Sequence, residues 1–343
     1  MLKKAVKKFL SVVLATAMVV SSITVYGASV KVPEDRVLTS VKEYSIAPGI
    51  KEKHITTVDK DGNNQVQAYM AEIDLKTSSV GMMAGYKNYD KTGKWGMQTV
   101  RDQAKAAEKA TGKTIVAAIN GDYFDMGTGQ PWGSLVMGGD IVQTQNDHPY
   151  FAIMKDGTAD CREAYEPLDD VVEAIGSPFF LVKDGKALEE LAADPYAMPR
   201  CAVGIKADGS VIIYEADGRQ APKSCGQSLY ETAKQMEAMG CVEALYLDGG
   251  GSATFATKTE GTDSLEVKNS PSDGTERKVS SSLFIYSDAK ADGEFDHATI
   301  SPLEEVYTPG STVQFEATGV DSAGGKADLP KEGPRKTPRQ EAR

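Results

Sequence analysis

Residues 245–255, LYLDGGGSATF, place an aspartate and three successive glycines directly after an apolar run. Glycine costs backbone entropy in a folded chain, so three in a row need a local reason, such as positive φ or the close approach of another group. Asp248 before the glycines and Ser252 after them favour a ligand-binding loop over a plain tight turn. Because successive backbone N–H groups can cradle an anion, the stretch predicts a buried strand that ends at an anion-binding loop.

The segments around this loop carry clear signals for regular structure. Ser228 followed by Glu231 is a capping-box start, and Gly240 is a stop, which predicts a helix over residues 228–239 that leads into a strand over 242–247. A second helix is expected over 97–110, where Thr99 and Asp102 supply the start. Residues 114–120 read as a buried strand, and 201–217 as a hairpin around an Asp-Gly turn.

These elements predict an α+β fold with a mixed, largely antiparallel sheet core, helices packed against it, and a partial C-terminal β-sandwich-like segment. The composition changes after Tyr286. We expect a signal peptide at 1–27, an extended lead-in at 28–53, a catalytic domain at 54–287, a linker and partial β-module at 288–330, and a disordered tail at 331–343.

The N-terminus predicts export. Four lysines precede an apolar run, the pattern of a secretion signal, and an uncleaved membrane anchor is the alternative. The formal net charge of −11 argues against a nucleic-acid binder. Export permits two disulfides among Cys161, Cys201, Cys225 and Cys241, and buried free thiols are the equal alternative.

Histidine limits the chemistry. The chain has 3 histidines, too few and too scattered for a histidine zinc site, and no cysteine pair suggests one. A Ser-His-Asp hydrolase would have to use His148, but no GxSxG accompanies it. We therefore expect no cofactor, while a calcium or magnesium ion held by carboxylates and carbonyls stays open.

A second strand ends in the same way as the first. INGDYFD, residues 119–125, delivers Asp122 from a buried strand, as residues 245–248 deliver Asp248. Two such strands could face each other across a pocket and supply paired carboxylates, whereas side-chain capping of a turn is the alternative. Arg200 begins a strand, and a half-buried arginine requires an anion or a structural carboxylate.

Six segments, in this order along the chain, resemble the phosphodiester glycosidase family. They are AAINGDYFD, PWGSLVM, MPRCAVGI, VIIYEADGR, LYLDGGGSATF and NSPSDGTERKVSSSLFIY. The resemblance runs from about residue 66 to 286. It implies a metal-independent glycosidase whose catalytic residues are Asp248, Asp122 and Arg200. The substrate-binding residues that we expect are Asn120, Gly121, His148, Asp217, Gly249, Gly250, Gly251, Ser252, Asn269 and Arg277.

The resemblance implies a bacterial hydrolase, secreted or at the cell surface, that removes the sugar from a glycosyl-1-phosphodiester and releases a phosphomonoester. Its partner would be a phosphate-containing glycan, such as a cell-wall polymer or exopolysaccharide. We expect the glycine amides, Arg200 and Arg277 to hold the phosphate, and the two aspartates to act on the sugar. The alternative is a non-catalytic glycan-binding protein that uses the same pocket.

Overall fold

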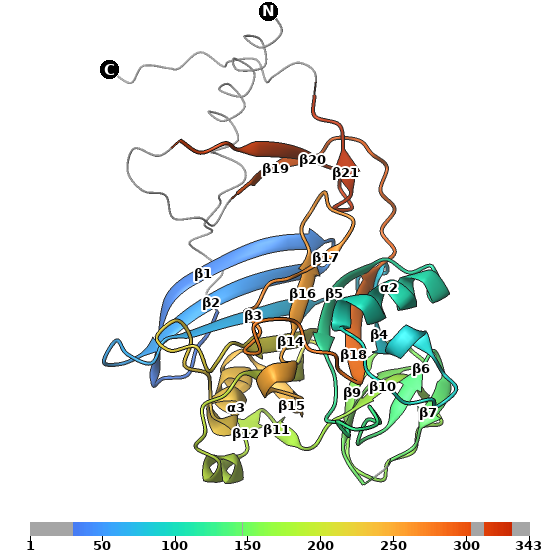
Figure 1. The fold of residues 1–343 in the computed structure, drawn as a ribbon, viewed down its shortest axis with the longest axis vertical. Helices are drawn as coiled ribbons and strands as arrows, with labels where there is room; N and C mark the ends of the chain where they lie inside the picture. Colours follow the sequence, from blue (N-terminus) through green and yellow to red (C-terminus); the bar gives the residue numbers. More distant parts are fainter. Residues whose placement is uncertain (1–29, 146, 303–311, 331–343) are drawn as a thin grey trace, which may run out of the picture. The chain divides into compact units, whose positions relative to one another are not determined.

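The computed structural model describes residues 30–145, 147–302 and 312–330 (Figure 1). The expected signal peptide at 1–27 and the expected tail at 331–343 lie outside the described residues. The chain divides into two compact units. The larger comprises Ala28–Thr259 and Ser264–Ala289, and the smaller includes Glu260–Asp263 and the chain from Lys290 onward.

Four antiparallel sheets account for the strands of the described residues. The first, in spatial order, contains β1 (Arg36–Ala47), β2 (Ile50–Asp59), β3 (Val66–Ile73), β14 (Val211–Ala216), β13 (Arg200–Lys206), β15 (Cys241–Leu247), β11 (Phe180–Lys183) and β12 (Lys186–Ala187). The second contains β17 (Leu265–Val267), β16 (Phe255–Lys258), β5 (Ile115–Asn120), β18 (Ser281–Ser287) and β4 (Val80–Tyr86). The third contains β7 (Asp140–Gln143), β6 (Leu135–Met137), β10 (Val171–Gly176), β8 (Tyr150–Met154) and β9 (Ala159–Arg162).

The fourth sheet belongs to the smaller unit. It consists of β19 (His297–Ser301), β20 (Glu316–Val320) and β21 (Lys326–Ala327). The two ring nitrogens of His297 lie at hydrogen-bond distance from carboxylate oxygens, Nδ1 from Asp296 and Nε2 from Glu260. These partners raise the pKa of His297 against the effect of its burial.

The expected α+β class is wrong. Strands make up 43% of the described residues and helices 11%, and the fold is mostly β. The two predicted α-helices do form within the described residues, as α2 (Val100–Thr111) and α3 (Leu229–Ala238), beside three short 3₁₀ turns, η1 (Lys87–Tyr89), η2 (Glu189–Ala193) and η3 (Gly250–Ser252). The observed fold class differs from the expected one because the apolar faces of the sheets are covered mostly by other sheets and not by helices.

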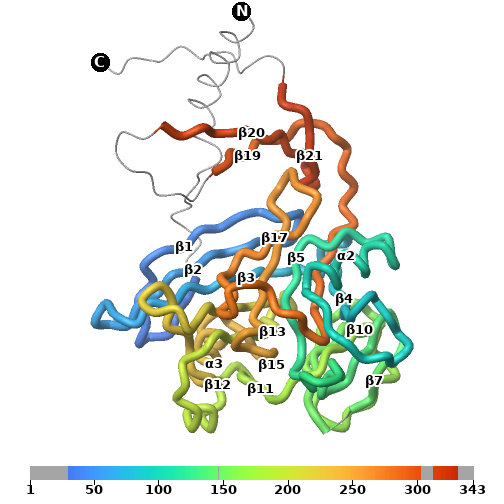
Figure 2. The backbone as a smooth tube through the Cα atoms, viewed as in Figure 1, coloured from blue at the N-terminus to red at the C-terminus, as the bar shows by residue number. Residues whose placement is uncertain are grey.

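The main core lies between sheets. Every member of the largest buried cluster except Ala253 belongs to a strand, and the strands come from the first three sheets. Along β13, Cys201, Val203 and Ile205 face this core, whereas Ala202 faces the opposite side. This alternation is the period of a strand buried on both faces. In Figures 1 and 2, the blue N-terminal strands lie beside strands from later in the chain, as the pairing of β3 with β14 requires.

Each α-helix covers part of one outer sheet face. In α3, Leu229, Ala233 and Met236 pack on the first sheet, and in α2, Val100 and Ala104 pack on the second. Neither helix, among the residues that the structure describes, is long and apolar enough to cross a membrane. All four cysteines carry free thiols.

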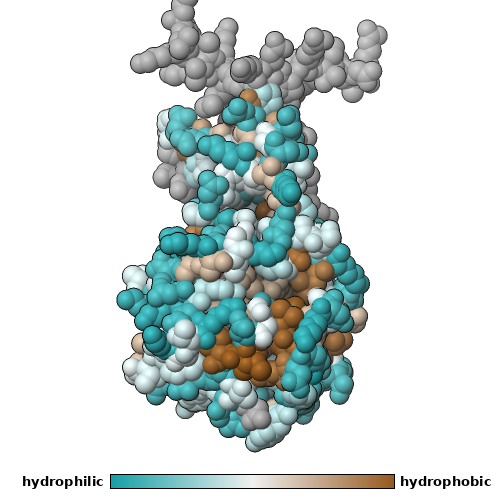
Figure 3. All heavy atoms as spheres, turned by 90° about the vertical axis from the view of Figure 1, so that its right-hand side faces the viewer, coloured by the Kyte–Doolittle hydropathy of each residue, from teal (hydrophilic) through white to brown (hydrophobic). Residues whose placement is uncertain are grey.

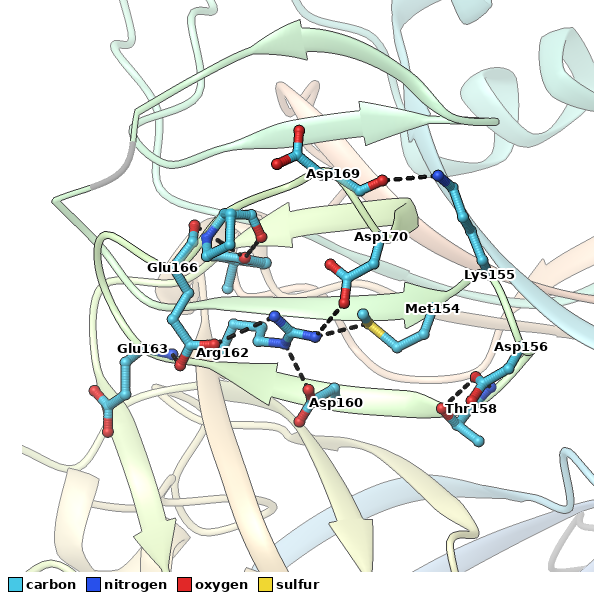
Figure 4. A network of polar contacts seen from close by, with 12 residues as sticks. Met154, Lys155, Asp156, Thr158, Asp160, Arg162, Glu163, Glu166, Asp169 and Asp170 are labelled. Atoms are coloured by element: carbon cyan, nitrogen blue, oxygen red, sulfur yellow. Dashed lines mark hydrogen bonds and ion pairs between the residues drawn. The ribbon is translucent and has the colours of Figure 1, made fainter.

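A polar network fixes the loop between β9 and β10. Arg162 donates from Nε to Asp160 at 2.5 Å, from Nη1 to Glu166 at 3.3 Å and from Nη2 to Asp170 at 2.9 Å (Figure 4). The carboxylates are well exposed, so each pair alone stabilises little. Sharing one guanidinium, they hold the loop against its strand.

Hydrophobic surface is unevenly distributed over the larger unit. On the face drawn in Figure 3, hydrophobic residues gather in one area that hydrophilic residues border. The exposed large hydrophobic side chains of the described residues include Met126, Trp132 and Ile141. Of these, Trp132 lies at the site described below.

We predict that Ser228→Ala lowers the free energy of unfolding by about 1 kcal/mol. The Ser228 hydroxyl accepts from the Glu231 amide, and the Glu231 carboxylate accepts from the Ser228 amide, so alanine removes half of a reciprocal cap. Urea denaturation measures the change. Ser228→Thr keeps a hydroxyl acceptor and serves as the control; equal losses in both variants would contradict the capping explanation.

Candidate functional site

The two predicted carboxylates emerge from strands of different sheets. Asp122 follows β5 in the second sheet, and Asp248 follows β15 in the first. The Asp248 amide donates to the Gly121 carbonyl at 2.8 Å, so the strand ends are bonded directly. The negative charge of Asp248 also acts on the pKa of Asp122. The structure therefore brings Asp122 and Asp248 together at one place.

Asn120 joins the two strand ends. Its side chain is fully buried, and its Nδ2 donates to the Asp248 carbonyl at 2.6 Å. Its Oδ1 accepts from the Thr254 amide at 3.0 Å and from the Cys201 thiol at 3.3 Å. Both polar ends of Asn120 are thus used within the protein, which positions the loop instead of offering a free group to a ligand.

Asp122 is a buried acid. Burial raises the pKa of Asp122 to about 7, the Gly133 amide that donates to Oδ2 opposes this, and the charge of Asp248 adds to it. Oδ1 is buried without a hydrogen-bond partner among the described residues. A carboxyl group in this setting can hold a proton near neutral pH and donate it.

Asp248 is held closer to its ionised form. Burial raises the pKa of Asp248 to about 6, while the Ser252 hydroxyl, the charge of Arg277 and the Gly249 amide lower it. Two neighbouring carboxyl groups whose environments separate their pKa values are suited to different roles in proton transfer.

Each of the three glycines has its own structural reason. A Cβ on Gly249 would lie 2.5 Å from the Pro199 carbonyl oxygen, Gly250 has φ +61°, and a Cβ on Gly251 would overlap the Arg277 guanidinium. The Gly249 amide faces the Asp248 carboxylate, and the Gly250 amide donates to Pro199 at 2.9 Å. Two of the three amides that we expected to cradle an anion are therefore paired within the protein.

Arg277 and Arg200 differ in what they can offer a ligand. Arg277 is about a third exposed, pairs with Asp273 at 2.7 Å and lies 3.5 Å from the Ser252 hydroxyl. Arg200 is buried and donates to the carbonyls of Gln227 and Tyr196 and to the Tyr246 hydroxyl. Its nearest carboxylate, Asp194, is 3.7 Å away. The guanidinium of Arg200 is thus engaged in the wall of the site.

Asp217 and Asn269 are buried and hydrogen-bond to each other. Asp217 accepts from the Ser270 amide at 2.9 Å, and the Asn269 amide group contacts Glu215 and Asp217. Burial raises the pKa of Asp217 to about 6, and burial together with the charge of Asp217 raises that of Glu215 well above its usual range. These side chains thus join the segment before β18 to the end of β14.

An aromatic wall stands beside Asp122, and the sequence analysis missed it. Tyr123 meets Trp132 edge-on at 5.3 Å and Tyr246 at 5.9 Å. Trp132 is 48% exposed and adjoins Gly133, whose amide binds Asp122. His148 lies 6.3 Å from Trp132 and lowers the pKa of Asp122 through its charge. Trp132 stands in the quoted PWGSLVM, but a tryptophan in a strand-rich sequence is usually buried, so exposure could not be anticipated.

Within the described ranges, no group of three or more His, Cys, Asp or Glu side chains is arranged to hold a metal ion. The site contains two carboxyl groups, the partly exposed guanidinium group of Arg277 and aromatic rings. Such a set can bind an anion at one end and a sugar at the other.

Comparisons with known proteins agree on one family. The sequence profile described as phosphodiester glycosidase matches residues 113–286. The N-acetylglucosamine-1-phosphodiester alpha-N-acetylglucosaminidase of Mus musculus is 29% identical over 161 residues, covering 40% of this chain and 31% of that protein. An uncharacterised prophage-derived protein of Bacillus subtilis is 39% identical over 98 residues, covering 28% and 14%. The chain thus matches about a third or less of the length of these curated relatives.

A solved structure has the same fold. The catalytic domain of a zebrafish N-acetylglucosamine-1-phosphodiester alpha-N-acetylglucosaminidase superposes with a TM-score of 0.55 at 22% identity, covering 73% of this chain and 88% of that one. A hypothetical protein from Synechocystis gives 0.57 at 15% identity, covering 72% and 64%.

We predict that Asp122→Asn gains thermal stability relative to the wild type as pH rises from about 4 to about 7. The folded-state pKa of Asp122 lies near 7 against an ordinary value of 3.8, so the unfolded state ionises first and the wild type loses stability across this window. Melting temperatures measured along the pH series test this. Asp125 is the control, because hydrogen bonds from Thr128 and Gly127 lower its pKa from the ordinary 3.8: Asp125→Asn should lose relative stability as pH rises toward about 4 and change little across the window above.

Proposed function

Because this chain belongs to the phosphodiester glycosidase family, we propose that it hydrolyses glycosyl-1-phosphodiesters and releases a free sugar and a phosphomonoester. The observation that carries the proposal is the meeting of Asp122 and Asp248 beside a loop lined by a partly exposed arginine. We assign the activity to residues 54–287. The names of the curated relatives favour an N-acetylglucosamine-1-phosphodiester as the substrate.

The two carboxyl groups divide the proton transfers. Asp248, kept closer to ionisation by Ser252 and Arg277, acts at the anomeric carbon as the base for water or as the nucleophile. Asp122, with the higher pKa, donates its proton to the leaving phosphate oxygen. The bond between the anomeric carbon and that oxygen breaks, and water supplies the new hydroxyl of the sugar.

The leaving group is itself stable. A phosphomonoester has a second pKa near 6, so cleavage needs anion stabilisation more than strong acid help. Arg277, next to Gly251 and Ser252, supplies positive charge at that end of the site. Arg200 holds Tyr246 and the chain before β13, and we propose that it positions the wall of the site.

The sugar binds at the aromatic end. Pyranose rings expose an apolar face that packs against aromatic side chains, and Trp132 presents such a surface beside Asp122. We further propose that the protein acts outside the cytoplasm on a phosphate-containing surface glycan. The lysine-rich, apolar N-terminal segment supports this placement.

We expect Asp248→Asn to lower kcat by about 10²–10⁴-fold, because it removes the group that acts at the anomeric carbon. The assay incubates the full chain with a panel of sugar-1-phosphodiesters, beginning with an α-linked N-acetylglucosamine diester, and measures free sugar with and without chelator. Circular dichroism checks that the variant is folded.

Asp125→Asn, an exposed aspartate near the site, is the matched control and should retain full activity. Wild-type activity in Asp248→Asn would rule out the assigned role. If the folded wild type binds the diesters and releases no sugar, the protein is a glycan-binding module and not a hydrolase.

Replacing Trp132 by alanine should raise KM about 10-fold and leave the melting temperature nearly unchanged, since the side chain is half exposed and its contribution is to the ligand. Trp132→Phe keeps an aromatic face and should recover most of the affinity. A KM that is insensitive to both changes would place the sugar elsewhere.

A further inference from the structure

Arg219 has an unusual backbone conformation at the edge of the site. It follows Gly218 at the end of β14 and has φ +60°, in the left-handed region that glycine adopts without cost and arginine does not. Its side chain is exposed. A strained residue of this kind marks a position where the surrounding structure fixes the backbone, and where glycine would relieve the strain.

The packing around Gly218 explains why the backbone is fixed. A Cβ on Gly218 would lie 2.5 Å from the Pro199 nitrogen and 2.6 Å from the Met198 carbonyl carbon, so this turn is pressed against the chain before β13. Just beyond Arg219, Gln220 and Ser224 exchange two backbone hydrogen bonds and close the loop. The backbone conformation of Arg219 is therefore set by the fold.

The Arg219 guanidinium lies beside the glycine loop without a carboxylate. A Cβ placed on Gly250 would be 3.3 Å from its Nη2. Its hydrogen bonds go from Nε and Nη2 to the sulfur of Met198, at 3.3 and 3.1 Å, and sulfur is a weak acceptor. The ion pairs found in the described ranges include none from Arg219. This cation is held in place and left electrostatically unmatched.

Arg277 contacts the next glycine. Its guanidinium occupies the space that a Cβ on Gly251 would fill, and it also reaches the Ser252 hydroxyl. Two guanidinium groups thus flank the consecutive glycines Gly250 and Gly251, one beside each. Guanidinium groups bind phosphate oxygens well. Arg277 has Nη1 to offer, because its Nε and Nη2 pair with the Asp273 carboxylate.

We propose that Arg219 and Arg277 form a clamp for the phosphate of the diester over Gly250 and Gly251. This inference rests on the proposed function and adds Arg219 as a substrate-binding residue. As the bond to the sugar breaks, negative charge builds on the leaving phosphate oxygen until the proton from Asp122 is fully transferred, and the released monoester carries up to two negative charges once that proton is lost. The clamp therefore stabilises the leaving group more than the substrate, and its loss lowers kcat as well as raising KM.

Because glycine relieves the backbone strain at position 219, the test can distinguish a loss of phosphate binding from a loss of stability. Arg219→Gly removes the guanidinium and relieves the left-handed strain, so it should keep or raise the melting temperature while lowering kcat/KM by about 100-fold. Arg219→Lys should recover part of the loss, because it keeps the charge without the two-donor geometry. Asp184→Gly, at another exposed position with positive φ (+49°), is the matched control and should leave kcat/KM unchanged.

Inorganic phosphate is the direct probe and does not depend on turnover. Calorimetric titration at low salt should show phosphate binding to the wild type and to Asp184→Gly, and weak or absent binding to Arg219→Gly. If the wild type cleaves diesters and Arg219→Gly matches it in both kcat/KM and phosphate affinity, the clamp is wrong and the proposed function stands.

If the wild type cleaves no diester, the proposed function fails, and the phosphate titration still decides the clamp. Binding that depends on Arg219 supports an anion site at Gly250 and Gly251. Absence of phosphate binding by the wild type, or binding that Arg219→Gly does not weaken, overturns it.

Discussion

The site depends on the hydrogen bonds that join the ends of β5 and β15. These strands belong to different sheets, so no sheet ladder fixes the distance between Asp122 and Asp248. The Asn120 side chain and the Gly121 carbonyl make that connection, at 2.6 and 2.8 Å to the Asp248 backbone. Because Asn120 is fully buried, losing one partner would leave a polar group unsatisfied in the core, and the connection is correspondingly rigid.

Packing sheets on sheets gives these carboxyl groups their chemistry. The core between the sheets removes water from the strand ends, and burial is the largest cause of the raised pKa values of Asp122 and Asp248. The first carboxyl then keeps its proton near neutrality, whereas Arg277 and Ser252 favour ionisation of the second. A more open site would leave both ionised at neutral pH and unable to divide proton donation and acceptance.

Local signals in the sequence predicted local structure well. Ser228 and Gly240 bound α3 as expected, and the Asp-Gly turn of the β13–β14 hairpin forms with Gly209 at φ +85°. The predicted fold class was wrong for a different reason. Both faces of β13 are buried, and the apolar pattern of a strand does not show whether a helix or a second sheet covers each face. Burial of individual polar side chains was only partly predictable: the place of Arg200 at a strand start indicated partial burial, but not that the carbonyls of Gln227 and Tyr196 engage its guanidinium.

The glycine loop shows how one sequence pattern admits two physical explanations. An anion cradle needs backbone amides that point to a common centre, but the Gly249 amide faces Asp248 and the Gly250 amide binds Pro199. What the absent side chains provide is space, so that Arg277 reaches the backbone at Gly251. In the reaction that we propose, positive charge then comes from side chains as a diester becomes a more highly charged monoester. Fixed amides carry only partial charges and could not match that change as fully.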